Sequence, residues 1–197
     1  NDQECDEAQL VAEPVQIIRG ASITSSVPDS MLMSTEFTYI LSVTIHSLPS
    51  TNWRNIFNVQ PTTATSSTPR FPGLWTNNGR LLWSMSTTNN PGNHGITPAV
   101  VVAGEKMTMA ITVSASEHIS KLFVGTGDSC DMMEYIFTFS GDFSVPSGSK
   151  VYLSERFGHH AAHGDVSQMV YFPKTLTKMD IVNFCQAGVP PTRATVA

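Results

Sequence analysis

Apolar and polar residues alternate along most of this chain, and this alternation limits the possible folds more than any other feature. In residues 36–46, EFTYILSVTIH, one face collects the side chains of Phe37, Tyr39, Leu41, Val43 and Ile45. A period of two places successive residues on opposite faces of a β-strand. The segment therefore predicts a long strand with one face buried.

Similar segments recur at short intervals, bounded by Gly, Pro, Asn or Ser. We expect further strands at residues 15–24, 55–60, 80–86, 106–114, 119–124, 135–139, 151–153 and 166–172. The turn Asn77-Asn78-Gly79 favours a hairpin. Short strands at this spacing are typical of antiparallel sandwiches and barrels, so the chain is predicted to be all-β.

One helix is expected near the end of the patterned region. Thr177 is a suitable N-cap, and Asp180 lies where a negative charge favours the helix dipole. The helix is expected to stop near residues 185–188, before two prolines. With no linker in view, residues 1–197 are interpreted as one domain with a patterned core at about 15–185.

Composition narrows the possible partners. Charged residues make up 14% of the chain, against about 25% in typical globular domains. The net charge is −5 and basic residues do not cluster, so a nucleic-acid partner is not expected. No apolar stretch approaches the roughly 18 residues of a membrane helix. The hydroxyl-rich composition favours a secreted or surface-exposed protein.

Three cysteines, Cys5, Cys130 and Cys185, lack the spacing of a zinc ribbon or thioredoxin motif. Cys5 and Cys185 lie just outside the two ends of the patterned region. If the first and last strands are neighbours, a Cys5–Cys185 disulfide would join the termini and leave Cys130 unpaired. The alternative is three free thiols in a reducing compartment.

Several segments together resemble the laminin-G-like, concanavalin-A-like jelly-roll domains. The opening pair EFTYILSVTIH and RNIFNVQ, the hairpin RFPGLWTNNGRLLWSMS and the hairpin KMTMAITVS with ISKLFVGTG are similar to strands of that superfamily. The ending GDVSQMVYFPKTLTKMDIVNF resembles its last strand and capped helix. The resemblance implies an antiparallel jelly-roll β-sandwich with one short C-terminal helix, a fold that serves many functions.

Catalysis is not expected. Jelly-roll glycoside hydrolases carry the pattern Glu-x-Asp-x-x-Glu, whose carboxylates act as nucleophile and acid. The nearest segment here is Ser129-Cys130-Asp131-Met132-Met133-Glu134, in which Ser129 replaces the nucleophile. We therefore assign no catalytic residue, and a divergent hydrolase is the least favoured function.

A histidine-rich loop and several turn aspartates are candidate ligand sites. His159, His160 and His163 could contact a ligand, although a solvated loop is the simpler interpretation. The resemblance implies that Asp165 lies at a rim that often carries calcium, and Asp128, Asp131 and Asp142 are further candidate ligands. Ca²⁺ needs several oxygen ligands, and aspartates in turns often only shape the turn.

Aromatic and amide side chains complete the list of candidates. Trp53 lies in a loop between strands, Trp75 is expected to be half exposed, and Trp83 is expected in the core. Residues 87–95, TTNNPGNHG, form a loop whose Asn89, Asn90 and Asn93 could hydrogen-bond a sugar. The sequence thus predicts a binding module for a glycan or glycoprotein, and the alternative is a structural subunit of an extracellular or surface assembly.

Overall fold

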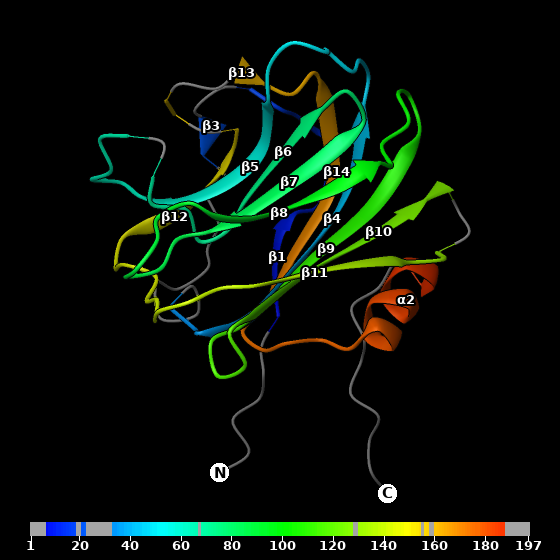
Figure 1. Cartoon of the computed structure of the whole chain (residues 1–197). Coiled ribbons are helices and arrows are strands. Elements are labelled where there is room, and N and C mark those ends of the chain that lie inside the picture. Colours follow the sequence, from blue (N-terminus) through cyan, green and yellow to red (C-terminus); the bar gives the residue numbers. More distant parts are fainter. Residues whose placement is uncertain are drawn as a thin grey trace, which may run out of the picture.

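Two β-sheets packed face to face form the body of the molecule (Figure 1). The computed structural model describes residues 7–18, 21–22, 33–66, 68–127, 130–154, 156–157 and 160–187. All strand pairs are antiparallel except one short pair, β13 with β5. The predicted fold class, an antiparallel sandwich with a short C-terminal helix, is confirmed. No helix in the described part of the chain is long and apolar enough to span a membrane.

Sheet A contains seven strands. Its order is β1 (Ala8–Val11), β14 (Gly164–Phe172), β4 (Glu36–Ile45), β9 (Lys106–Ser114), β10 (Ile119–Thr126) and β11 (Met133–Thr138), and β2 (Val15–Gln16) also pairs with β14. Sheet B also contains seven. Its order is β3 (Ala21–Ser22), β12 (Ser149–Leu153), β5 (Arg54–Pro61), β6 (Gly73–Asn77), β7 (Arg80–Met85) and β8 (Asn93–Ala99), and β13 (His160–Ala161) also pairs with β5.

Most expected strands are present, but two predictions were wrong. Residues 15–24 do not form one strand: β2 pairs with β14 in sheet A, whereas β3 pairs with β12 in sheet B. Strand β8 begins inside the segment expected to be a loop. Its sequence NHGITPA lacks alternation of apolar and polar residues. Gly95 in this strand lies over the Trp83 ring, where a Cβ would come within 2.4 Å of a ring carbon.

The inner faces of both sheets form the main core. Trp83 is buried there, as expected, and its indole donates to the Ser120 hydroxyl at 3.2 Å. Tyr39 and Tyr171 from neighbouring strands pack with ring centroids 4.9 Å apart. The face predicted for residues 36–46 is confirmed, because Phe37, Tyr39, Leu41, Val43 and Ile45 all belong to this core.

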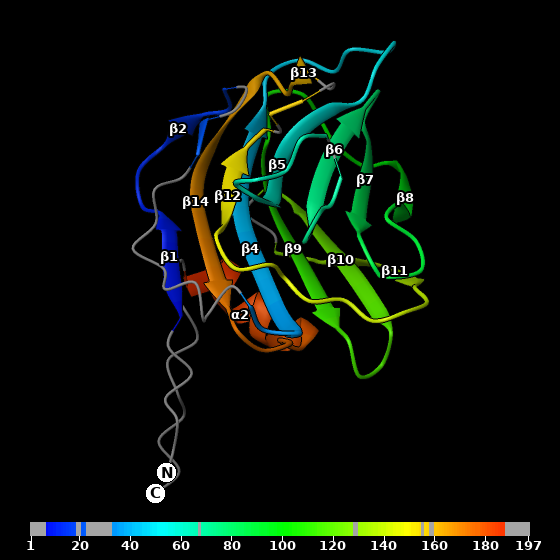
Figure 2. The ribbon, with the colours of Figure 1, turned by 90° about the vertical axis from the view of Figure 1, so that its left-hand side faces the viewer.

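Helix α2 (Lys178–Ala187) covers part of the outer face of sheet A (Figures 1 and 2). Its Ile181 and Phe184 pack on the sheet side chains Ile40, Ala110, Phe123, Val170 and Phe172. The predicted cap is confirmed, because the Asp180 amide donates to the Thr177 hydroxyl at 3.2 Å and the Asp180 carboxylate accepts from the Thr177 amide at 2.9 Å.

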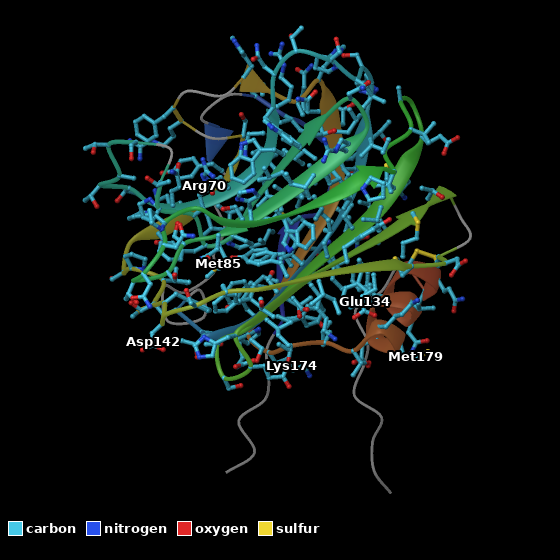
Figure 3. All side chains as sticks on the ribbon, in the orientation of Figure 1. Arg70, Met85, Glu134, Asp142, Lys174 and Met179 are labelled. Atoms are coloured by element: carbon cyan, nitrogen blue, oxygen red, sulfur yellow. A yellow bond between two sulfur atoms is a disulfide. The ribbon has the colours of Figure 1, made fainter. Side chains whose placement is uncertain are left out.

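The predicted disulfide partner of Cys185 was wrong. Cys185 bonds to Cys130, which lies just before β11 and was expected to be unpaired. Figure 3 shows this bond beside α2. The last strand of sheet A, β14, pairs with β2 from the segment expected to form the first strand, and also with β1, which was not expected. However, Cys185 belongs to a helix that packs over β9 and β10, so it meets the segment that follows β10. Cys5 lies outside the described residues.

Candidate functional site

A set of buried polar side chains lies on the outer face of sheet B. On β5, Phe57 and Val59 face the core. The alternate residues Asn58 and Gln60 face the other way, and both are fully buried. On β6, Leu74 faces the core, so Trp75 projects to the same outer face as Asn58. We call the set Asn55, Asn58, Gln60 and Trp75 the amide shelf.

The geometry of the shelf depends on Gly73, which lies opposite Asn58 in the strand register. A Cβ on Gly73 would lie 2.1 Å from the Trp75 ring carbon Cη2 and 2.9 Å from Asn58 Oδ1. Because Gly73 has no side chain, the indole of Trp75 lies across the β6 backbone beside the Asn58 amide. The shelf thus places an aromatic ring next to hydrogen-bonding groups.

Much of the shelf's hydrogen-bonding capacity is unused. Neither Asn58 Nδ2 nor Asn58 Oδ1 has a partner among the described residues, and the same holds for Gln60 Oε1 and Asn55 Oδ1. In contrast, Gln60 Nε2 donates to Ser66 O at 3.2 Å and Asn55 Nδ2 donates to Leu74 O at 3.1 Å. Leaving a buried polar group unsatisfied costs about 1–3 kcal/mol. Such groups call for an explanation beyond packing.

Two arginines reach over this face of sheet B. The Arg70 guanidinium carbon lies 4.4 Å from the centroid of the Trp75 ring, and Arg70 is labelled in Figure 3. The Arg156 guanidinium carbon lies 5.6 Å from the ring centroid of Tyr152, the register partner of Asn58. Arg156 also donates from Nη1 to Thr62 O at 2.8 Å. Positive charge, aromatic rings and amides therefore lie together.

Sequence reasoning found only part of this site. Trp75 was expected to be half exposed, but it is buried with Arg70 over its ring. Asn58, Gln60 and Arg70 were not singled out. The available signal was NIFNVQ itself, in which the polar positions of a strand are amides rather than the hydroxyls common elsewhere. Trp53 lies just ahead of β5 and is half buried.

The amide loop is held together by its own side chains. Asn93 Nδ2 donates to the Thr87 hydroxyl at 2.9 Å, and Asn90 Oδ1 accepts from the Gly92 amide at 2.9 Å. The loop also packs on the turn that holds Asp142, whose backbone oxygen accepts from the Thr88 amide at 2.8 Å. Asn89 and Asp142 are exposed. A ligand role for Asn89, Asn90 and Asn93 stays a prediction.

The histidine loop forms a small polar cluster at the start of β14. Asp165 Oδ2 lies 2.6 Å from Nε2 of His46, a residue that the sequence did not single out. His163 Nδ1 lies 3.2 Å from the Ser47 hydroxyl, and its ring packs edge-on against His46. His160 is exposed on β13.

None of these groups forms a metal site in the part of the chain that is described. No three His, Cys, Asp or Glu side chains there could hold a metal ion together. His159 and Asp128 lie outside the described residues. Glu134 lies on β11 and pairs with Lys121 at 3.1 Å, and Asp131 is exposed. Calcium binding stays a prediction.

Comparisons with known proteins extend the fold assignment. No family model matches the sequence, and no curated protein sequence matches it. Among solved structures, the CBM40 module of the Ruminococcus gnavus IT-sialidase, bound to α2,3-sialyllactose, is 16% identical with a TM-score of 0.68, over 88% of this chain and 96% of that one. The leech intramolecular trans-sialidase is 16% identical with a TM-score of 0.69, over 92% of this chain and 28% of that one.

The receptor-binding domain of a botulinum neurotoxin, mosaic serotype C/D, is also similar. It is 13% identical with a TM-score of 0.61, over 83% of this chain and 39% of that one. At such low identity these likenesses establish a shared β-sandwich fold. They assign no ligand and no residue to this chain.

Proposed function

We propose that this chain is a non-catalytic glycan-binding module and that its ligand binds on the amide shelf. The observation that carries the proposal is the unused hydrogen-bonding capacity of Asn58 and Gln60, which are buried beside Trp75. Amides offer donors and acceptors together and so match the hydroxyl groups of a sugar. The indole face suits the apolar face of a sugar ring.

Arg70 is central to the proposed binding mode. Its guanidinium lies over Trp75, so a sugar that stacks on the indole must displace it. A displaced guanidinium can pair with a carboxylate on the ligand through two parallel hydrogen bonds. Sialyllactose, which the CBM40 module binds, is therefore a suitable first probe.

The proposal extends to family and location. We place the chain with the concanavalin-A-like jelly-roll modules, because its sandwich is similar to that of the CBM40 module. The Cys130–Cys185 disulfide is typical of an oxidising compartment, so we propose an extracellular setting.

The test is binding of α2,3-sialyllactose to the full chain by isothermal titration calorimetry, with wild type and the variant Asn58→Leu. Leucine has the same branched shape and number of heavy atoms but no polar atoms, so it removes two unpaired buried groups. We expect Asn58→Leu to weaken binding about tenfold or more while its unfolding midpoint is unchanged or raised.

The matched control is Asn89→Ala in the exposed amide loop, which should bind as wild type does. Weaker binding by Asn89→Ala with normal binding by Asn58→Leu would move the site to the loop and refute the shelf. Repeating the titration with calcium and then with EDTA tests the calcium prediction. If neither sialyllactose nor a wider glycan array shows binding, the structural-subunit alternative is favoured.

A further inference from the structure

A polar cavity lies on the opposite sheet from the amide shelf. It is a recess of about 180 Å³ on the outer face of sheet A, at the C-terminal end of α2. The side chains that line it include Ser42, Lys106, Thr108, Gln168 and Gln186. Cys130, Cys185 and Phe184 form its wall on the helix side. It shares no residue with the amide shelf.

The floor of the recess is a row of polar residues across three strands. Gln168 on β14 lies opposite Ser42 on β4, and Ser42 lies opposite Thr108 on β9. The neighbouring row on the same face, Val170, Ile40 and Ala110, is apolar and is covered by α2. The outer face of sheet A thus changes from apolar to polar where the helix ends. The polar row is not covered by the helix and lines the recess.

The groups in this recess have hydrogen-bonding capacity to spare. Ser42 and Thr108 are buried, yet the Ser42 hydroxyl and the Gln168 amide form no hydrogen bond with another described residue. Thr108 Oγ1 lies 3.5 Å from Cys185 Sγ, a weak contact. Gln168 is half buried, and Ser42 and Gln168 both line the recess, so their polar groups are available to a ligand that enters it.

Lys106 adds a positive charge at this recess. It belongs to the next row on the same face, opposite Thr44, and Thr44 lies opposite Asp165. Asp165 is already paired with His46 at 2.6 Å. Lys106 forms no ion pair with any described residue, so its ammonium group is available for an anion. The recess therefore combines hydroxyl, amide and ammonium groups in a space smaller than a typical drug-sized pocket.

We infer that this recess is a second binding site, specific for a hydroxylated carboxylate about as large as one acidic sugar residue. Lys106 pairs with the carboxylate, while Ser42 and Gln168 bond the hydroxyls. The Cys130–Cys185 disulfide holds the end of α2 in place as the wall of the site. Binding therefore depends on the disulfide, whereas the amide shelf, on the other sheet, does not.

The experiment follows backbone amide shifts of the full chain by NMR during titration with glucuronate, and with glucose as the uncharged counterpart. We expect glucuronate to shift the amides around Ser42, Thr108 and Gln168, and glucose to bind about tenfold more weakly or not at all. Lys106→Met and Gln168→Leu should each weaken glucuronate binding by a similar factor. The double variant Cys130→Ser with Cys185→Ser should abolish it.

Two controls make the outcome decisive. Lys178→Met removes an exposed lysine at the other end of α2 and should bind as wild type, as should Asn58→Leu on the amide shelf. If glucuronate shifts only β5 and β6, shifts nothing at millimolar concentration, or binds Lys106→Met normally, there is no second site. Asn58→Leu changes only the amide shelf. A negative result for the recess therefore does not bear on the proposed glycan-binding function of the shelf.

Discussion

At the scale of single residues, the contrast between Asn58 and Asn90 shows why side-chain type alone does not locate a site. Both are asparagines, and an exposed amide loop looks more suitable for binding than a strand. Yet Asn90 uses its side chain to shape its own loop, whereas Asn58 is buried with both polar atoms unpaired among the described residues. The difference arises because Asn58 is buried by segments that are distant from it in the sequence.

Gly73 is the residue whose substitution tests the shelf most directly without removing a polar group. In Gly73→Ala the new Cβ would overlap the Trp75 ring, at 2.1 Å from Cη2. The ring must shift, so we expect a loss of about 1–3 kcal/mol in the free energy of unfolding and a loss of glycan binding. Urea titration and calorimetry measure the two effects.

The control for that substitution is Gly92→Ala. There the nearest atom to a new Cβ is Asn90 Oδ1 at 3.6 Å, an ordinary contact distance. We expect near wild-type stability and binding from Gly92→Ala. Equal behaviour of the two variants would show that the position of Trp75 does not depend on Gly73.

At the scale of elements, the N-cap of helix α2 can be predicted from the sequence, whereas the disulfide of the helix cannot. Its N-cap follows from local sequence rules and is confirmed. The disulfide of the helix does not follow from local sequence rules. Three cysteines leave the pairing open, and the partner of Cys185 depends on where the helix packs. The helix lies over β9 and β10, which brings Cys185 to Cys130.

Breaking that disulfide should loosen the helix and lower stability. Its two cysteines are 55 residues apart, and closing a loop of that length stabilises by about 4 kcal/mol in the chain-entropy model. We expect Cys130→Ser with Cys185→Ser to lower the unfolding free energy by up to that amount, measured by urea titration. Peptide mapping without reductant should find Cys130 linked to Cys185, and a Cys5–Cys185 peptide would contradict the structure.

At the scale of the whole molecule, the two sheets share one core but differ on their outer faces. Sheet A is partly covered by α2 (Figure 2), and the two pack through a second apolar cluster. The outer face of sheet B carries buried amides below two arginines. We expect the shared core to unfold as a unit, because both sheets contribute side chains to it.

That core contains Tyr39 and Tyr171, and their burial makes the fold sensitive to alkali. Burial raises the pKa of Tyr39 well above its usual value, and it also raises the pKa of Tyr171. In the unfolded chain both ionise near pH 10. The contribution of the two neutral tyrosines to the free energy of unfolding is therefore complete below about pH 10. Above pH 10 this contribution is lost by up to about 1.4 kcal/mol per pH unit for each tyrosine.

Tyr39→Phe and Tyr171→Phe should each reduce this alkaline loss of stability. The measurement is the unfolding free energy between pH 8 and 12, each variant being compared with its own value at pH 8. An unchanged slope in both variants would show that other groups cause the alkaline unfolding.

The sequence by itself determined the all-β class, the inner face of the strand at residues 36–46 and the start of the helix. These follow from alternation and capping, which act between residues close together in the chain. Only the tertiary structure decided the split of residues 15–24 between two sheets, the Cys130 partner of Cys185 and the burial of Asn58 and Trp75. Each of these depends on segments distant in sequence, whose approach is governed by how the two sheets and α2 pack rather than by any local pattern.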